Sequence, residues 1–149
     1  MVLIGFVDSD DFHGKLSRNP FNFDHFNLQQ ISCEVDGQSF PGRPYTADFS
    51  KHQSLDCYLG LVEALDRRND PSGEVAINRE MFNGGFAIYG MKLSTCGKGT
   101  LGLIRNGNLS VAVSFDQPLK QTIMMVCFML YDSVIENNQH RILTTDSTA

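Results

Sequence analysis

The chain has 149 residues, of which 42% are apolar and 19% are charged, and it carries a net charge of −5. This size fits one domain and leaves no room for a second core. The apolar and aromatic content excludes intrinsic disorder, and the acidic balance argues against a protein that binds nucleic-acid phosphates directly.

Strand patterns dominate the first third of the chain. Val2–Val7 is an apolar run, and Gln30–Val35 alternates apolar with polar residues, as a strand with one buried face does. Asp36-Gly37 then supplies a hairpin turn before Gln38–Phe40. We expect a strand at the start and a β-hairpin after it.

Helical spacing interrupts these strands once. Ser54 is a candidate helix cap, and the helix predicted over Ser54–Arg68 ends before the turn Asp70–Gly73. A second helical turn is predicted at Asn78–Met81, before a further strand in Phe86–Leu93. The apolar positions of the first helix are Leu55, Tyr58, Leu59, Val62 and Leu65.

The last third returns to strands. The Asn-Gly pair in Arg105–Asn108 favours a tight turn, so Leu101–Ile104 and Leu109–Phe115 are predicted to form a hairpin. Ile123–Tyr131 is apolar on both faces, which is typical of a strand in the middle of a sheet, covered on both sides, or of one that meets another subunit.

About eight short strands separated by turn residues are typical of a sandwich or barrel. We therefore predict an all-β, antiparallel jelly-roll sandwich with one short inserted helix. It forms a single domain over residues 1–143, followed by a loose C-terminal tail over residues 144–149.

The cysteines indicate a reducing environment. Cys33, Cys57, Cys96 and Cys127 form no Cys-x-x-Cys pair, so we expect free, buried thiols and no zinc site. No signal-peptide pattern is recognised at the N-terminus, and no apolar run is long enough to cross a bilayer, so we expect no contact with a membrane.

No pattern of residues predicts catalysis, a cofactor or a metal. Asp8–Gly14 resembles a calcium loop but places Phe12 and His13 where a ligand and a glycine are required, so an acidic turn is favoured. Gly97–Thr100 fails the phosphate-loop pattern, because Gly99 separates the lysine from the threonine. The histidines form no pair with metal-binding spacing. We expect no enzyme.

Aromatic residues gather in one short segment, which we call the Phe segment (residues 19–26). Phe21, Phe23 and Phe26 lie close together without strand alternation, and Asn19 and Asn22 are suited to hold a turn. The segment is either a loop that folds its side chains over the sandwich or a contact between subunits, and the sequence favours neither. We take these five residues as candidates for an oligomer interface.

Several motifs resemble capsid proteins of the Polinton (Maverick) and adintovirus-like family. The resemblance rests on Gly5–Gly14, Asn19–Phe23 and Val35–Gln38, and it continues in order along nearly the whole chain. Its later segments are Ser54-Leu55, Ile77–Phe86, Asn106–Leu109, Tyr131–Glu136 and Arg141. The chain departs from the family at Gly90–Thr95, where members carry a Phe-Asp-Leu-Thr-Pro-Asp-like run, and in its longer helix after Ser54.

The resemblance covers the C-terminal part of longer proteins. It implies one of the two rolls of a double-jelly-roll capsid protein, which would pair with itself or with a sister jelly-roll domain, form a trimeric capsomer and contact other capsid proteins. The expected location is the virion capsid, after synthesis inside the host cell.

Two other functions are weighed. A single-roll vertex protein would assemble as a pentamer. A ligand- or sugar-binding β-sandwich would present aromatic residues on a concave sheet face, whereas this chain has no tryptophan and its aromatic cluster falls in a loop.

Overall fold

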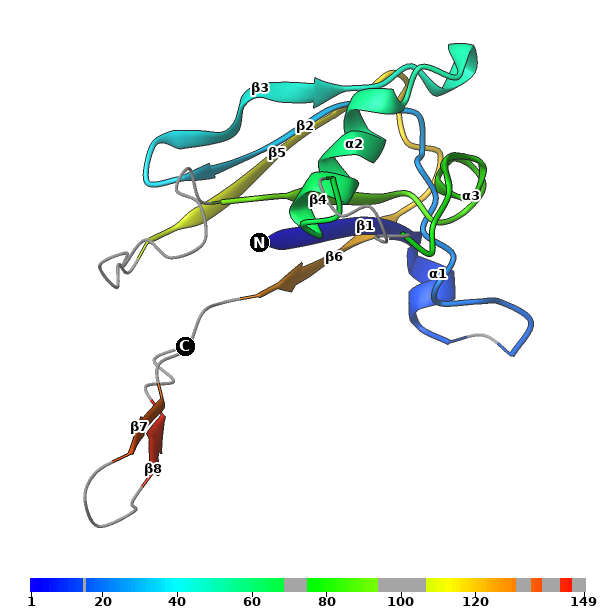
Figure 1. The fold of residues 1–149 in the computed structure, drawn as a ribbon. Helices are drawn as coiled ribbons and strands as arrows, with labels where there is room; N and C mark the ends of the chain where they lie inside the picture. The colour runs from blue at the N-terminus through cyan, green and yellow to red at the C-terminus, as the bar shows by residue number, and fades with distance from the viewer. Residues whose placement is uncertain (15, 69–74, 94–106, 131–134, 138–142, 146–149) are drawn as a thin grey trace.

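The fold is known from a computed structural model, which describes residues 1–14, 16–68, 75–93, 107–130, 135–137 and 143–145 (Figure 1). Strands predominate, and helices are few and short. The strands are β1 (Val2–Asp8), β2 (Leu28–Val35), β3 (Gln38–Thr46), β4 (Ile88–Met91), β5 (Leu109–Phe115), β6 (Ile123–Met129), β7 (Ile135–Asn137) and β8 (Leu143–Thr145). The helices are α1 (Ser9–Phe12), the 3-10 helix η1 (Phe49–Lys51), α2 (Leu55–Ala64) and α3 (Arg79–Asn83).

Six of the strands form two antiparallel three-stranded sheets. Their orders are β4-β1-β6 and β3-β2-β5. The remaining strands, β7 and β8, pair with each other, and Thr144 and Thr145 of the predicted tail belong to β8. These sheets confirm the predicted all-β class.

The hairpin of β2 and β3 forms where the sequence predicts it. Asp36 and Gly37 both have positive φ angles, 49° and 82°, which a two-residue type I′ turn requires. The Asp36 side chain also accepts a hydrogen bond from the backbone of Asn108, which links this turn to the start of β5.

The core lies between the two sheets. One face of β1, with Val2, Ile4 and Phe6, packs against the inner face of β2, where Ile31 and Cys33 lie. The ring of Phe6 contacts the rings of Tyr89 in β4 and Phe115 in β5, which joins both sheets.

Helix α2 closes one side of this sandwich. It packs against β4 and β3, which are the edge strands of the two sheets on that side (Figure 1). The close approach depends on Gly90, because a methyl group there would lie 2.8 Å from the Cα of Leu61. The predicted helices are confirmed, although α2 ends at Ala64, before the predicted end.

Among the described strands the central one of this sheet is β1, so the prediction that the later apolar run Ile123–Tyr131 is a central strand covered on both sides is wrong. β1 lies between β4 and β6, whereas β6 lies at the edge of its sheet, and its side chains are half-buried or exposed. The physical reason is that Phe23 covers the outer face of β1 at Gly5, so β1 is enclosed on both faces. A run that is apolar on both faces does not by itself distinguish these two positions.

The prediction of free, buried thiols is confirmed for two of the described cysteines. Cys127 lies in β6 and is exposed, so the prediction that all thiols are buried is wrong for it, whereas Cys33 and Cys57 are buried and free. The predicted strand Leu101–Ile104, the loop Gly97–Thr100 and Cys96 lie outside the described residues.

The central position of β1 can be tested by truncating side chains in the two strands. Ile4→Ala should lower the free energy of unfolding by about 2–4 kcal/mol, because Ile4 is fully buried. Met125→Ala, at a position 47% exposed in β6, should cost less than about 1 kcal/mol. Denaturant unfolding of both variants at low protein concentration measures the difference, and equal losses would contradict the edge position of β6.

Candidate functional site

The strongest candidate site is the edge of β6 that faces away from β1, which we call the β6 edge (Ile123–Leu130). Among the residues that the structure describes, β6 pairs on one side with β1 and has no strand on its other side. The N–H and C=O groups on that side therefore face away from β1.

The hydrogen bonds to β1 show which backbone groups point outward. Met1 and Leu130 exchange hydrogen bonds of 3.0 and 2.9 Å, and Thr122 O accepts one of 3.0 Å from Ser9 N. In an antiparallel ladder the direction alternates along the strand. The even-numbered residues of β6 consequently bond to β1, and the groups that point outward belong to Ile123, Met125, Cys127 and Met129.

Large apolar side chains are exposed on both faces of this edge. On the inner face, Met125 and Met129 are 47% and 40% exposed, because α2 closes the opposite side of the sandwich and no described element closes this one. On the outer face, Phe128 and Leu130 are 57% and 55% exposed. Their concentration along one strand distinguishes this surface from scattered exposed apolar residues.

The β6 edge also lacks the residues that normally protect an edge strand. Natural proteins place lysine, proline or a bulge at exposed edges to prevent pairing with other chains. Residues 123–130 contain neither a charged residue nor proline, and β6 pairs with β1 without a bulge. This surface is suited to contact another protein chain.

The Phe segment divides between packing and exposure. Phe23 is half-buried, its ring lies against Gly5, and its carbonyl accepts a 2.9 Å hydrogen bond from Ala87 N. Phe26 is half-buried against the core, whereas Phe21 is 70% exposed.

The backbone and side chain of Asn19 hold the turn of the segment. Asn19 accepts a 3.0 Å hydrogen bond from Phe21 N, and its carbonyl accepts another from Asn22 N. The Asn22 side-chain oxygen lies against Gly85, where a Cβ atom would come within 2.5 Å of it. The segment thus folds over the sheet and presents Phe21 outward, and its role as an interface stays a prediction.

The acidic residues at the end of β1 and in α1 bind the side chain of Arg18. Asp8 caps α1 by accepting a 2.8 Å hydrogen bond from Asp10 N. Arg18 donates to Asp11 at 2.8 Å and to Asp8 at 3.2 Å, and these carboxylates raise the pKa of Arg18. The carboxylates therefore hold the chain after α1 in place.

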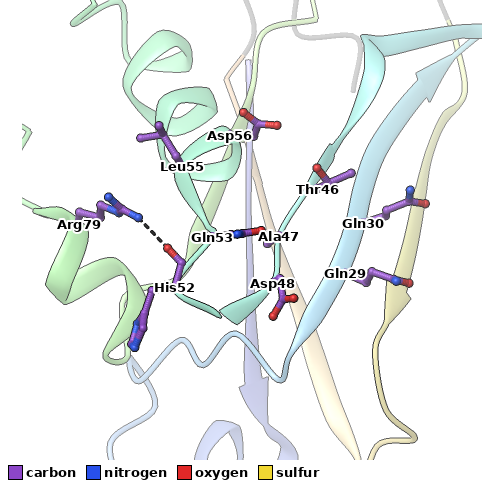
Figure 2. A pocket seen from close by; sticks show the side chains of 10 residues that line it. All are labelled: Gln29, Gln30, Thr46, Ala47, Asp48, His52, Gln53, Leu55, Asp56 and Arg79. Carbon is purple, nitrogen blue, oxygen red and sulfur yellow. Dashed lines mark hydrogen bonds between the residues drawn. The ribbon is translucent and has the colours of Figure 1, made fainter. Parts of the chain in front are cut away.

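A polar groove of about 570 Å³ lies between β2, β3 and the start of α2 (Figure 2). Its charged side chains already have partners: Arg79 donates to His52 O at 2.7 Å, and Asp48 pairs with Lys51 at 2.8 Å. The hydrogen bonds from Lys51 and Ser50 lower the pKa of Asp48 to about 2. The lining residues are Gln29, Gln30, Thr46, Ala47, Asp48, His52, Gln53, Leu55, Asp56 and Arg79, and none of them is Phe, Tyr or Trp, the residues on which sugars commonly stack.

The histidines of the described residues serve local roles. His13 donates from its ring to Ser9 O at 2.6 Å, and His52 ends η1 in the left-handed region, with a φ of 56°. His25 stacks on Phe49 at 4.0 Å, and burial lowers its pKa. His140 lies outside the described residues. Among the residues that the structure describes, no group of three or more His, Cys, Asp or Glu side chains is placed to hold a metal ion.

Comparison with known proteins finds a distant relative. An uncharacterized protein of Caenorhabditis elegans, F54H12.2, is 29% identical over 117 residues, which are 76% of this chain and 28% of that protein. The chain thus spans less than a third of that relative's length. No family model and no solved structure matches the chain. Within the described residues, the helices are too short or too polar to cross a membrane.

The division within the Phe segment can be tested with two serine substitutions. Phe23→Ser should lower the free energy of unfolding by about 2 kcal/mol, because it removes the ring that covers Gly5. Phe21→Ser should change it by less than about 0.5 kcal/mol. Thermal melts give the stabilities, and sedimentation measures association. A loss of association in Phe21→Ser with an unchanged melt would assign an interface to the segment, and equal melts would contradict the packing of Phe23.

Proposed function

We propose that this chain is a structural capsid protein domain that acts by self-assembly, of viral origin or derived from an integrated element. The observation that carries the proposal is the β6 edge, an uncharged apolar strand with exposed side chains on both faces. A protein that functions alone gains nothing from such a surface, whereas a shell protein covers it with a neighbour.

The order of the strands supports a jelly roll as the finer description of the fold. β1 pairs with β6 in one sheet, and β2 pairs with β5 in the other, so the strand pairs are nested and alternate between the sheets. Two Greek-key motifs in a jelly roll extend this nesting to about eight strands. The inserted helix of the proposal is α2, which lies between β3 and β4 in the chain.

The proposed partners are further copies of the chain or a sister jelly-roll domain in a trimeric capsomer, together with other capsid proteins. The motifs shared with the Polinton and adintovirus-like capsid family favour these partners. In this proposal the domain holds no cofactor and carries out no reaction, and its place is the virion capsid.

The experiment that tests this function is assembly of the purified chain. We expect capsomers or shells in negative-stain electron microscopy, and a mass above the 16.6 kDa monomer in light scattering. Met125→Lys should reduce assembly, because it places a charge in the contact. Leu119→Lys is the matched control, since Leu119 is 41% exposed but lies outside the β6 edge.

Each outcome decides the proposal. Assembly that Met125→Lys weakens and Leu119→Lys preserves supports it, provided that both variants melt like the parent. A chain that stays monomeric at concentrations of hundreds of micromolar would overturn it.

A further inference from the structure

We infer that residues 24–27 form an acid-sensitive turn, in which a proton on His25 opens the turn and uncovers Phe49 of the core. We call this segment the His25 turn. The inference concerns the fold of the single chain and goes beyond the proposed self-assembly. It rests on the hydrogen bond that the His25 ring accepts, on the backbone of the turn and on the contact with Phe49.

The ring nitrogen Nδ1 of His25 is a hydrogen-bond acceptor. The backbone nitrogen of Asn27 lies 2.9 Å from it, and a backbone N–H can only donate. Nδ1 therefore carries no proton, and the proton of the neutral ring is on Nε2. A second proton has to bind at Nδ1, where it faces the N–H of Asn27. Protonation thus replaces the acceptor by a donor and breaks this hydrogen bond.

The backbone of the turn depends on such hydrogen bonds. Phe26 and Asn27 have φ angles of 46° and 52°, in the left-handed region that is uncommon for residues other than glycine. Asp24 accepts a 3.4 Å hydrogen bond from Phe26 N, and His25 O accepts one of 2.8 Å from Leu28 N. Loss of the bond to Nδ1 therefore weakens a turn whose backbone is strained.

The His25 ring also covers part of the core. It stacks on Phe49 with a centroid distance of 4.0 Å and an interplanar angle of 5°. Phe49 is buried in the core and stacks in turn on Phe82. Phe26 packs against the same core. An open turn consequently presents two phenylalanine side chains to solvent.

Charged groups near the ring act on the proton in both directions. The titratable groups on the neighbouring segments are Asp24 in the turn, Asp48, Lys51 and His52 at η1, and Asp116 after β5. Asp24 favours the charged ring, since its Oδ1 lies 3.9 Å from Nε2. Asp48 and Lys51 pair with each other at 2.8 Å. Burial of the ring opposes the charge and has the larger effect, so the pKa of His25 is lowered.

The sign of the pH dependence follows from this lowered pKa. The closed turn prefers the neutral ring, whereas the open turn exposes a histidine with an ordinary pKa of about 6.5. The stabilisation of the closed turn is therefore complete above about pH 6.5 and is lost as the pH falls through the lower pKa of the closed turn. Acid opens the turn.

Nitrogen NMR of the histidine rings and amide hydrogen exchange test this inference in the unmodified chain. At about pH 7.5 we expect Nδ1 of His25 to carry no proton and the N–H of Asn27 to be protected from exchange. A fall to about pH 5.8, still above the isoelectric point near 5.2, should lower the protection factor of this amide by about twofold or more. The dye anilinonaphthalene sulfonate, which binds apolar surface, should fluoresce more strongly over the same range.

His25→Asn separates the proton from the side chain. The asparagine oxygen takes the place of Nδ1 as an acceptor but binds no proton in this range. Protection of the Asn27 amide and the dye signal should therefore lose their pH dependence. His52→Asn is the matched control, because His52 is exposed and its left-handed backbone suits asparagine. It should behave like the parent, and thermal melts at about pH 7.5 confirm that both variants are folded.

The outcomes decide the inference whether or not the chain assembles. Opening that follows the titration of His25, disappears in His25→Asn and persists in His52→Asn supports it. A proton on Nδ1 at neutral pH overturns it, as does protection of the Asn27 amide that does not fall in acid. Loss of the pH dependence in His52→Asn also overturns it. If His25→Asn does not fold, the parent decides, because an opening midpoint that differs from the titration of the His25 ring contradicts the mechanism.

Discussion

The enclosure of β1 on both faces is the constraint on which the rest of the structure depends. Its inner face packs against β2, and its outer face is covered at Gly5 by Phe23. A strand buried on both faces must have a neighbour on each edge, because its backbone N–H and C=O groups have no water to bond with. β4 and β6 supply those neighbours, so the position of β1 places both of them.

The two sides of the sandwich differ in how they are closed. α2 covers the side of β3 and β4, and its close approach depends on the absence of a side chain at Gly90. On the opposite side, Met125 and Met129 of β6 carry inner-face side chains that remain 47% and 40% exposed. Within the described residues, one side of the sandwich is therefore covered by a helix, and the other leaves core-type residues exposed. This asymmetry connects the architecture with the proposed self-assembly.

The sequence reveals the Phe segment and the apolar run of β6 as candidate sites, but it does not reveal which of their side chains are buried. The Phe segment was recognisable from its aromatic residues, but aromatic composition does not reveal which ring packs inward. Phe23 packs inward because Gly5 has no side chain in the space that its ring occupies, and this contact joins two residues that are not neighbours in the sequence. The apolar run of β6 indicates either a covered central strand or a strand that meets another subunit, and the run itself does not predict that β6 lies at a sheet edge.

Local patterns along the chain determined the class of the fold and most of its elements. The turn at Asp36-Gly37 and the alternation of Leu109–Phe115 depend on nearest neighbours, and these elements form where the sequence predicts them. Only the tertiary structure decided which apolar strand is central, since β1 and β6 are both apolar on both faces, and burial depends on what packs against them. Exposure of Cys127 follows from the same cause. Hydrophobicity determines that a surface must be covered, and the three-dimensional arrangement determines whether the same chain or another molecule covers it.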